Sequence, residues 1–187
     1  MSHYIVDQLK STLGNQLKIV QQWLVNNRLS LHLGKTEAIV FGSKRRLNVC
    51  ENFDIEYNGS VVKSVDKVKY LGVTIDQDLS GCSMANSVLG KINRGLKILY
   101  RKREFFKSYE KKLLCSTLLQ AFFDYGNNVW YPSLCKLLNT KLQTSKNKMI
   151  RFVLDLGSRS HVGYYCFEQL KSSICKKNRL FEVMFYV

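Results

Sequence analysis

The sequence predicts an α+β protein in which a helix and a small antiparallel sheet are followed by an all-helical region. Three patterns carry this prediction. Apolar residues recur with helical spacing over residues 4–26, strand-forming runs flank an Asn-Gly pair within residues 53–65, and helical periodicity returns from about Met84. The strand signals between the helices account for three or four strands, which we expect to be antiparallel.

Composition and charge limit the class of protein and suggest the chemistry of a partner. The 187 residues are 45% hydrophobic, enough for one domain or two small ones with a real core. The net charge is +15, and residues 86–151 hold 14 Lys and Arg against three acids. Such an excess indicates a polyanionic partner, either nucleic acid or an anionic membrane surface. A solvated basic surface without a function is the alternative.

The first helix is expected over residues 4–26, with Trp23 at the edge of an apolar stripe. The stripe consists of Ile5, Leu9, Leu13, Leu17, Val20 and Leu24. A Gly-Lys-Thr triplet follows at residues 34–36. A phosphate-binding P-loop is excluded here, because it needs a glycine at position 29, which is Leu29, and a helix after the lysine. The β-branched, apolar residues 38–41 instead predict a strand, with Lys35 at its start.

The middle of the chain carries the strand signals. In "FDIEYNGSVVKSV" the Asn58-Gly59 pair favours a type I′ turn, because both central residues of that turn need a positive φ. A further strand is predicted from Lys69 to Asp76. Asp76 and Asp78 follow as turn and helix-capping residues.

The helix expected from Met84 separates apolar from basic side chains. Val88, Ile92, Gly95, Leu96 and Leu99 fall on one side; Lys91, Arg94, Lys97, Arg101 and Lys102 fall on the other. One face can therefore pack on a core while the other contacts phosphates. Further helices are expected near residues 107–123 and 134–154, and from Tyr164 to the end of the sequence.

The six cysteines are not arranged as a metal site. None are spaced C-x-x-C, and a site built from His161, Cys166 and Cys175 has little support, so no metal is expected. The first twenty residues do not form a secretory signal, and no uncharged apolar run approaches about 18 residues. We therefore expect free thiols, no membrane span and an intracellular location, in the nucleus or the cytoplasm.

The order of the motifs resembles the reverse transcriptase of non-LTR (LINE-type) retrotransposons, in the part that follows the catalytic Tyr-Xaa-Asp-Asp loop. The matching segments are "WLVNNRLSLHLGKTEAIVFGS", the hairpin, "VKYLGVTIDQDLS", the basic helix, "FDYGNNVWYPS" and "KLQTSKNKMIRFVL". Each is weak alone, but their order and spacing are specific. The resemblance implies that residues 1–79 form the end of the palm, and residues 80–187 a truncated helical thumb and connector.

The resemblance also implies roles for particular residues. Lys35 matches a lysine near the phosphates of the incoming nucleotide, although a solvated lysine beside a strand is the alternative. Tyr70, Leu71 and Gly72 match the primer grip, which holds the primer end, against the alternative of a buried strand with a glycine bulge. The basic helix matches the start of the thumb and would contact phosphates. Trp130 and Tyr131 are expected to pack rather than stack on bases.

The chain departs from the family where catalysis would occur. It contains no Asp-Asp pair, so it offers no catalytic residue and no ligands for the Mg²⁺ that an intact parent enzyme would need. Related sequences often carry Trp and His after "DLS", where "GCSMAN" stands here. We expect this chain alone to be inactive, and at most to bind the backbone of an RNA–DNA hybrid or DNA duplex, with no small-molecule substrate. The alternative is a non-functional remnant or an interaction module without a nucleic-acid role.

Overall fold

The computed structural model describes residues 3–48, 53–57 and 59–162, and side chains from Gln8 onward. The chain divides into two compact units, residues 1–83 and 84–187, and each is described by itself. The first contains helices and two small antiparallel sheets, and the described part of the second is helical. The predicted α+β class is therefore confirmed. No described helix is long and apolar enough to span a bilayer.

The first unit begins with helix α1 (His3–Asn26), which lies along strand β1 (Ile55–Tyr57). Its predicted apolar stripe is only partly covered: Leu13 and Leu17 are half-buried, whereas Leu9 and Val20 are exposed. Ile5 lies outside the described side chains. Among the residues of this unit whose burial is described, few are buried: Phe53, Tyr57, Val62, Asp76 and Gly81.

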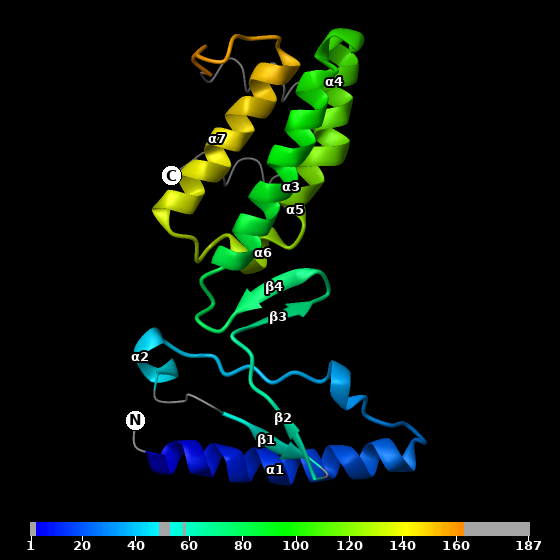
Figure 1. The fold of residues 1–187 in the computed structure, drawn as a ribbon, viewed down its shortest axis with the longest axis vertical. Coiled ribbons are helices and arrows are strands. Elements are labelled where there is room, and N and C mark those ends of the chain that lie inside the picture. The colour runs from blue at the N-terminus through cyan, green and yellow to red at the C-terminus, as the bar shows by residue number, and fades with distance from the viewer. Residues whose placement is uncertain (1–2, 49–52, 58, 163–187) are drawn as a thin grey trace. The chain divides into compact units, whose positions relative to one another are not determined.

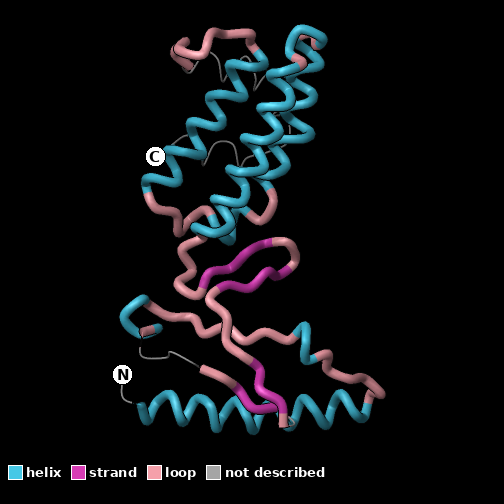
Figure 2. The backbone as a smooth tube through the Cα atoms, in the orientation of Figure 1, coloured by secondary structure: helices cyan, strands magenta, loops and turns pink. Residues whose placement is uncertain are grey.

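The predicted hairpin forms between β1 and β2 (Ser60–Val62), with Tyr57 opposite Ser60 (Figure 1). Gly59 has a φ of 75°, the positive value that the turn requires, while Asn58 lies outside the described residues. Strand β2 is followed by a second hairpin, formed by β3 (Lys67–Tyr70) and β4 (Val73–Asp76). The two sheets are separate, with two strands each (Figure 2).

Two strand predictions are wrong. Residues 69–76 are not one strand, because Leu71 and Gly72 have φ values of 45° and 82° and fold the segment into the β3–β4 hairpin. Residues 38–41 do not form a strand: Ala38 makes a single parallel bridge to Ser64. The Val65 backbone N–H donates to the Ala38 carbonyl at 2.8 Å beside this bridge. Two short helices, η1 (Leu33–Lys35) and α2 (Lys44–Leu47), flank that segment.

Helix α3 (Cys82–Arg101) begins at a cluster of capping side chains. Asp76 Oδ2 accepts hydrogen bonds from the Ser83 backbone N–H at 3.1 Å and from the Ser80 hydroxyl at 3.4 Å, and Asp78 accepts one from the Ser80 N–H. The hydrogen bonds from Ser80 hold the pKa of Asp78 below its usual range. The roles predicted for these carboxylates are confirmed: Asp76 caps α3, and Asp78 holds the turn before it.

Three long helical segments make up most of the second unit as far as residue 162, where the described residues end. After α3 come η2 (Arg103–Phe105), α4 (Ser108–Leu114), a π-helical turn η3 (Cys115–Leu119) and α5 (Gln120–Asp124), then α6 (Asn127–Trp130) and α7 (Lys136–Val153). Figure 1 shows α3, the continuous helix from α4 to α5, and α7 side by side. The helices predicted near 107–123 and 134–154 are confirmed. The helix predicted from Tyr164 lies outside the described residues.

The core of this unit combines one face of each helix. Val88, Ile92, Leu96 and Leu99 of α3 are buried as predicted, together with Leu119, Phe123, Leu142, Ile150 and Phe152 of the other segments. Gly95 allows close packing here, since a Cβ at this position would lie 2.5 Å from Leu119 Cδ2 and would force the Leu119 side chain to shift. Trp130 is also buried, and its indole N–H donates to the Tyr125 carbonyl at 3.1 Å, which confirms a packing role.

A buried lysine lies within this core. Lys146 of α7 is 6% exposed, and its Nζ lies 5.0 Å from the centroid of the Phe123 ring. Burial lowers the pKa of Lys146 to about 8, while the nearby Asp124 carboxylate acts in the opposite direction. The charged form of this side chain therefore opposes folding at neutral pH.

We expect Asp76→Ala to lower the free energy of unfolding by about 1–2 kcal/mol, because the Ser83 N–H loses its acceptor at the start of α3. Urea unfolding followed by circular dichroism measures the change. Asp66→Ala, at an exposed position of the same unit, is the control. Equal stability of the two variants would show that the cap contributes nothing.

The wild-type protein should become more stable as pH rises from about 8 to about 10.5, because the unfolded chain binds the Lys146 proton more tightly than the folded chain does. Replacing Lys146 by Met should remove this rise, which amounts to about 3 kcal/mol. Unfolding free energies across that pH range measure it. The matched control is Lys141→Met, at an exposed position of the same helix, which should keep the wild-type dependence.

Candidate nucleic-acid interface

The exposed side of α3 is the strongest candidate site in the second unit. Lys91, Arg94, Lys97 and Arg101 are all exposed, and they lie opposite the buried residues of the same helix. The packing of that apolar side on the core fixes the direction in which the cations point. The sequence of α3 contains no Asp or Glu, so no carboxylate on this helix offsets them. We call these four residues the basic face of α3.

The dimensions of the basic face suit a nucleic-acid backbone. From Lys91 to Arg101 the helix rises about 15 Å. Successive phosphates of one strand are spaced about 3.4 Å along the duplex axis, so this length covers roughly four steps. Four cations spread over that length, with the exposed Ile98 among them, can neutralise several phosphates at once. Contacts of this kind provide affinity without reading the base sequence.

Two members of the basic face also make contacts within the protein. Lys91 Nζ lies 5.5 Å from the centroid of the Phe122 ring, and Arg94 Nε donates to the Gly90 carbonyl at 3.3 Å. The contact of Arg94 leaves its two terminal guanidinium nitrogens for a phosphate. Lys102, predicted as a fifth member, lies just after the end of the helix, as the residue preceding η2.

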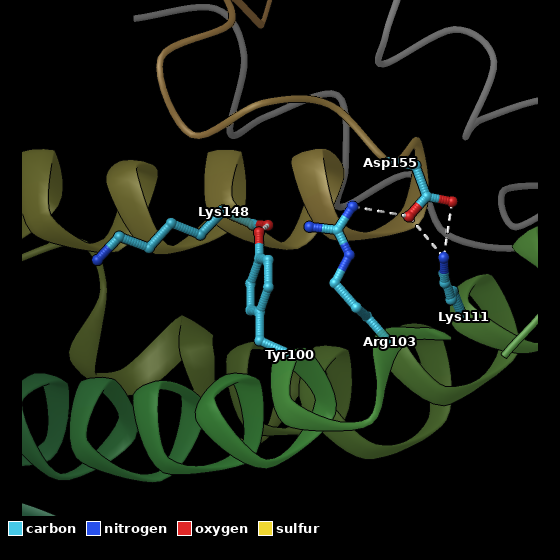
Figure 3. A network of polar contacts seen from close by, with 5 residues as sticks. All are labelled: Tyr100, Arg103, Lys111, Lys148 and Asp155. Atoms are coloured by element: carbon cyan, nitrogen blue, oxygen red, sulfur yellow. Dashed lines mark hydrogen bonds and ion pairs between the residues drawn. The ribbon is translucent and has the colours of Figure 1, made fainter. Parts of the chain in front are cut away.

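The segment that follows α3 is fastened to α7 by one carboxylate. Asp155 pairs with Arg103 of η2 at 3.3 Å, and both of its oxygens accept from Lys111 Nζ of α4, at 2.5 and 2.6 Å (Figure 3). Lys111 is 5% exposed, whereas the Asp155 side chain is 42% exposed. In the same region the Tyr100 hydroxyl donates to the Lys148 carbonyl at 3.0 Å. These contacts fix the end of α3 against α7.

The residues predicted as a primer grip lie together at a hairpin tip in the first unit. Tyr70 ends β3, Leu71 and Gly72 form the turn, and Tyr70 and Leu71 are 65% and 74% exposed. The alternative of a buried strand with a bulge is therefore wrong. A positive φ at Leu71 costs about 1 kcal/mol, which is the kind of strain found at functional turns.

Lys35 does not belong to the β3–β4 hairpin. It is the last residue of η1 and is exposed, and its backbone N–H donates to the His32 carbonyl at 2.9 Å. The strand that it was expected to precede is absent.

The described part of the chain contains no group of three or more His, Cys, Asp or Glu residues that could hold a metal ion. The carboxylates of Asp76 and Asp78 accept hydrogen bonds from the turn and from α3, so this pair does not fit a Mg²⁺ site. Cys82, Cys115 and Cys135 are free thiols, and burial raises the pKa of Cys115 to about 12. Cys166 and Cys175 lie outside the described residues.

Known proteins give no identification. No protein-family model, no curated protein and no solved structure matches this chain. The resemblance to reverse transcriptases therefore stays an interpretation of the sequence motifs.

Removing the two partners of the buried ion pair should have unequal effects. Asp155→Ala leaves Lys111 as a buried cation without its carboxylate, and should cost about 2–4 kcal/mol of unfolding free energy. Lys111→Met leaves a half-exposed carboxylate that still pairs with Arg103, and should cost less than about 1 kcal/mol. Denaturant unfolding of both variants measures the asymmetry. Equal losses would contradict the burial argument.

Proposed function

We propose that this chain is the C-terminal part of a non-LTR retrotransposon reverse transcriptase, and that it binds the backbone of a template–primer duplex. The observation that carries the proposal is the basic face of α3, which bears four exposed cations and no acid. The motif order in the sequence supplies the family, and the exposed hairpin tip at Tyr70 and Leu71 supports a second contact. An RNA–DNA hybrid or a DNA duplex is the proposed partner.

No catalytic step is assigned to this chain. Polymerisation requires a pair of carboxylates that hold two metal ions, whereas Asp76 caps α3 and Asp78 holds the turn before that helix. The parent enzyme would supply the polymerase activity and bind Mg²⁺. The proposed role of this part is to hold the duplex, in which Lys35 takes no part unless a complete active site is present.

A hollow in the first unit favours the second candidate function, an interaction module without a nucleic-acid role. The hollow has a volume of about 280 Å³, and apolar side chains from α1, β1 and β2 dominate its lining, including Leu13, Leu17, Ile55 and Val62. An apolar hollow of this kind can accept a side chain from another protein. Under this alternative, folded protein would not bind a hybrid at physiological salt.

The deciding experiment is fluorescence anisotropy of a labelled RNA–DNA hybrid titrated with the full chain at several salt concentrations, with circular dichroism to establish folding. Arg94→Gln, Lys97→Gln and Arg101→Gln together should weaken binding and flatten the slope of log K against log salt by up to about 2.7, since each lost phosphate contact contributes about 0.9. Lys91 is left unchanged because of its contact with Phe122.

The matched control neutralises three exposed cations of α2, Lys44, Arg45 and Arg46, and so lowers the net charge equally. It should leave the salt slope near the wild-type value. If both triple variants lose the same affinity for the hybrid, binding depends on net charge alone and the assignment to α3 is wrong. A folded wild-type chain that ignores the hybrid would contradict the proposed function.

A further inference from the structure

The turn between α3 and α4 exposes two aromatic side chains. Phe105, at the end of η2, is 78% exposed, and Tyr109, in the first turn of α4, is 74% exposed. A single exposed aromatic residue is unremarkable, but these two are only four residues apart, which limits their separation along the chain to about 14 Å. We call residues 101–112 the α3–α4 turn.

The aromatic side chains of the turn are surrounded in sequence by cations. Arg101, Lys102, Lys107 and Lys112 belong to the turn, and none of them is ion-paired with another described residue. Lys102 Nζ lies 5.6 Å from the centroid of the Phe105 ring. The turn contains two acids, Glu104 and Glu110. The Glu110 carboxylate accepts a hydrogen bond from the Lys107 backbone N–H at 2.8 Å. The turn therefore combines exposed rings with an excess of positive charge.

The same turn is held in place from its inner side. Arg103 and Lys111, which lie on either side of the exposed rings in sequence, are both tied to Asp155 (Figure 3). Phe105 and Tyr109 thus project from a segment that is fixed at both ends. Because the backbone is already ordered, little conformational entropy remains to be lost when a ligand binds.

We propose that the α3–α4 turn is a binding site for unpaired nucleic acid, in which bases stack on Phe105 and Tyr109 while the cations contact the adjoining phosphates. Exposed aromatic residues interleaved with cations are the chemistry by which proteins bind single strands without sequence preference. An anionic membrane is the weaker candidate, because insertion needs a continuous apolar face and the charged Lys107 and the polar Ser108 lie between these two rings in the sequence. This site borders the basic face of α3 and shares Arg101 with it, but its two stacking residues, Phe105 and Tyr109, lie outside that face and do not require duplex binding.

The test uses the full chain and two labelled probes, a homopolymeric single strand of roughly 12 nucleotides and a blunt RNA–DNA hybrid. Phe105→Ala and Tyr109→Ala should each weaken single-strand binding at least about five-fold, with an unchanged salt slope and little change in hybrid binding. Lys102→Gln with Lys107→Gln should instead reduce the single-strand salt slope by about 1.4. Loss of affinity without loss of slope is specific to stacking.

Leu137→Ala provides the matched control, since Leu137 is 65% exposed in the first turn of α7, at the other end of the helix from the Asp155 anchor. It should change neither affinity. Single-strand binding that is unaffected by Phe105→Ala and Tyr109→Ala would overturn the inference, even where hybrid binding persists. Binding to phosphatidylserine vesicles that depends on Phe105, without single-strand binding, would overturn it in favour of a membrane. A chain that binds the single strand through these rings but ignores the hybrid would support it and contradict the proposed function.

Discussion

The packing of the apolar side of α3 on α5 and α7 is the constraint on which the rest of the second unit depends. Burial of Val88, Ile92, Leu96 and Leu99 fixes the rotation of the helix about its own axis. The direction of the cations is then a consequence of the core and needs no interaction of its own. A row of like charges repels itself, and the energy that holds it in place comes from the opposite side of the helix.

Asp155 complements that packing at the end of the bundle. Its carboxylate, two residues after the end of α7, joins η2 and α4, which lie 52 and 44 positions earlier in the sequence. Because the Lys111 cation is buried, the cost of removing it from water offsets much of its attraction to Asp155. The main effect of the ion pair is therefore to fix the positions of the two ends of the α3–α4 turn. The two proposed binding surfaces are therefore built on a shared support.

Sequence periodicity was sufficient to predict the long helices and the separation of faces on α3, because both depend on local spacing. The helix-capping role of Asp76 and the turn role of Asp78 were also predictable from local sequence. The long-range features were not: no local pattern pairs Lys111 with Asp155, or places Lys146 against Phe123. The exposure of Phe105 and Tyr109 could have been suspected only from the alternation of aromatic and basic residues.

The errors in the sheets have a common physical origin. Residues 69–76 have the β-branched composition of a strand, and the reversal at Leu71 lacks the Asn or Asp that usually marks a type I′ turn. The segment 38–41 also has strand composition, yet it finds only one bridging partner. Strand composition reports a preference for extended backbone, whereas a sheet also needs a neighbour of sufficient length.

The π-helical turn at Cys115–Leu119 restricts the number of residues that the helix from α4 to α5 can contain. A π turn holds one residue more than an α-helical turn, so it shifts the angular phase of every side chain after it by about 100°. Lys111 before the turn faces Asp155, and Phe123 after it faces the core, and both orientations depend on that extra residue. A homologue with one residue fewer here could form a continuous α-helix. Such a helix could orient a residue at the Lys111 position toward Asp155 or one at the Phe123 position toward the core, but not both.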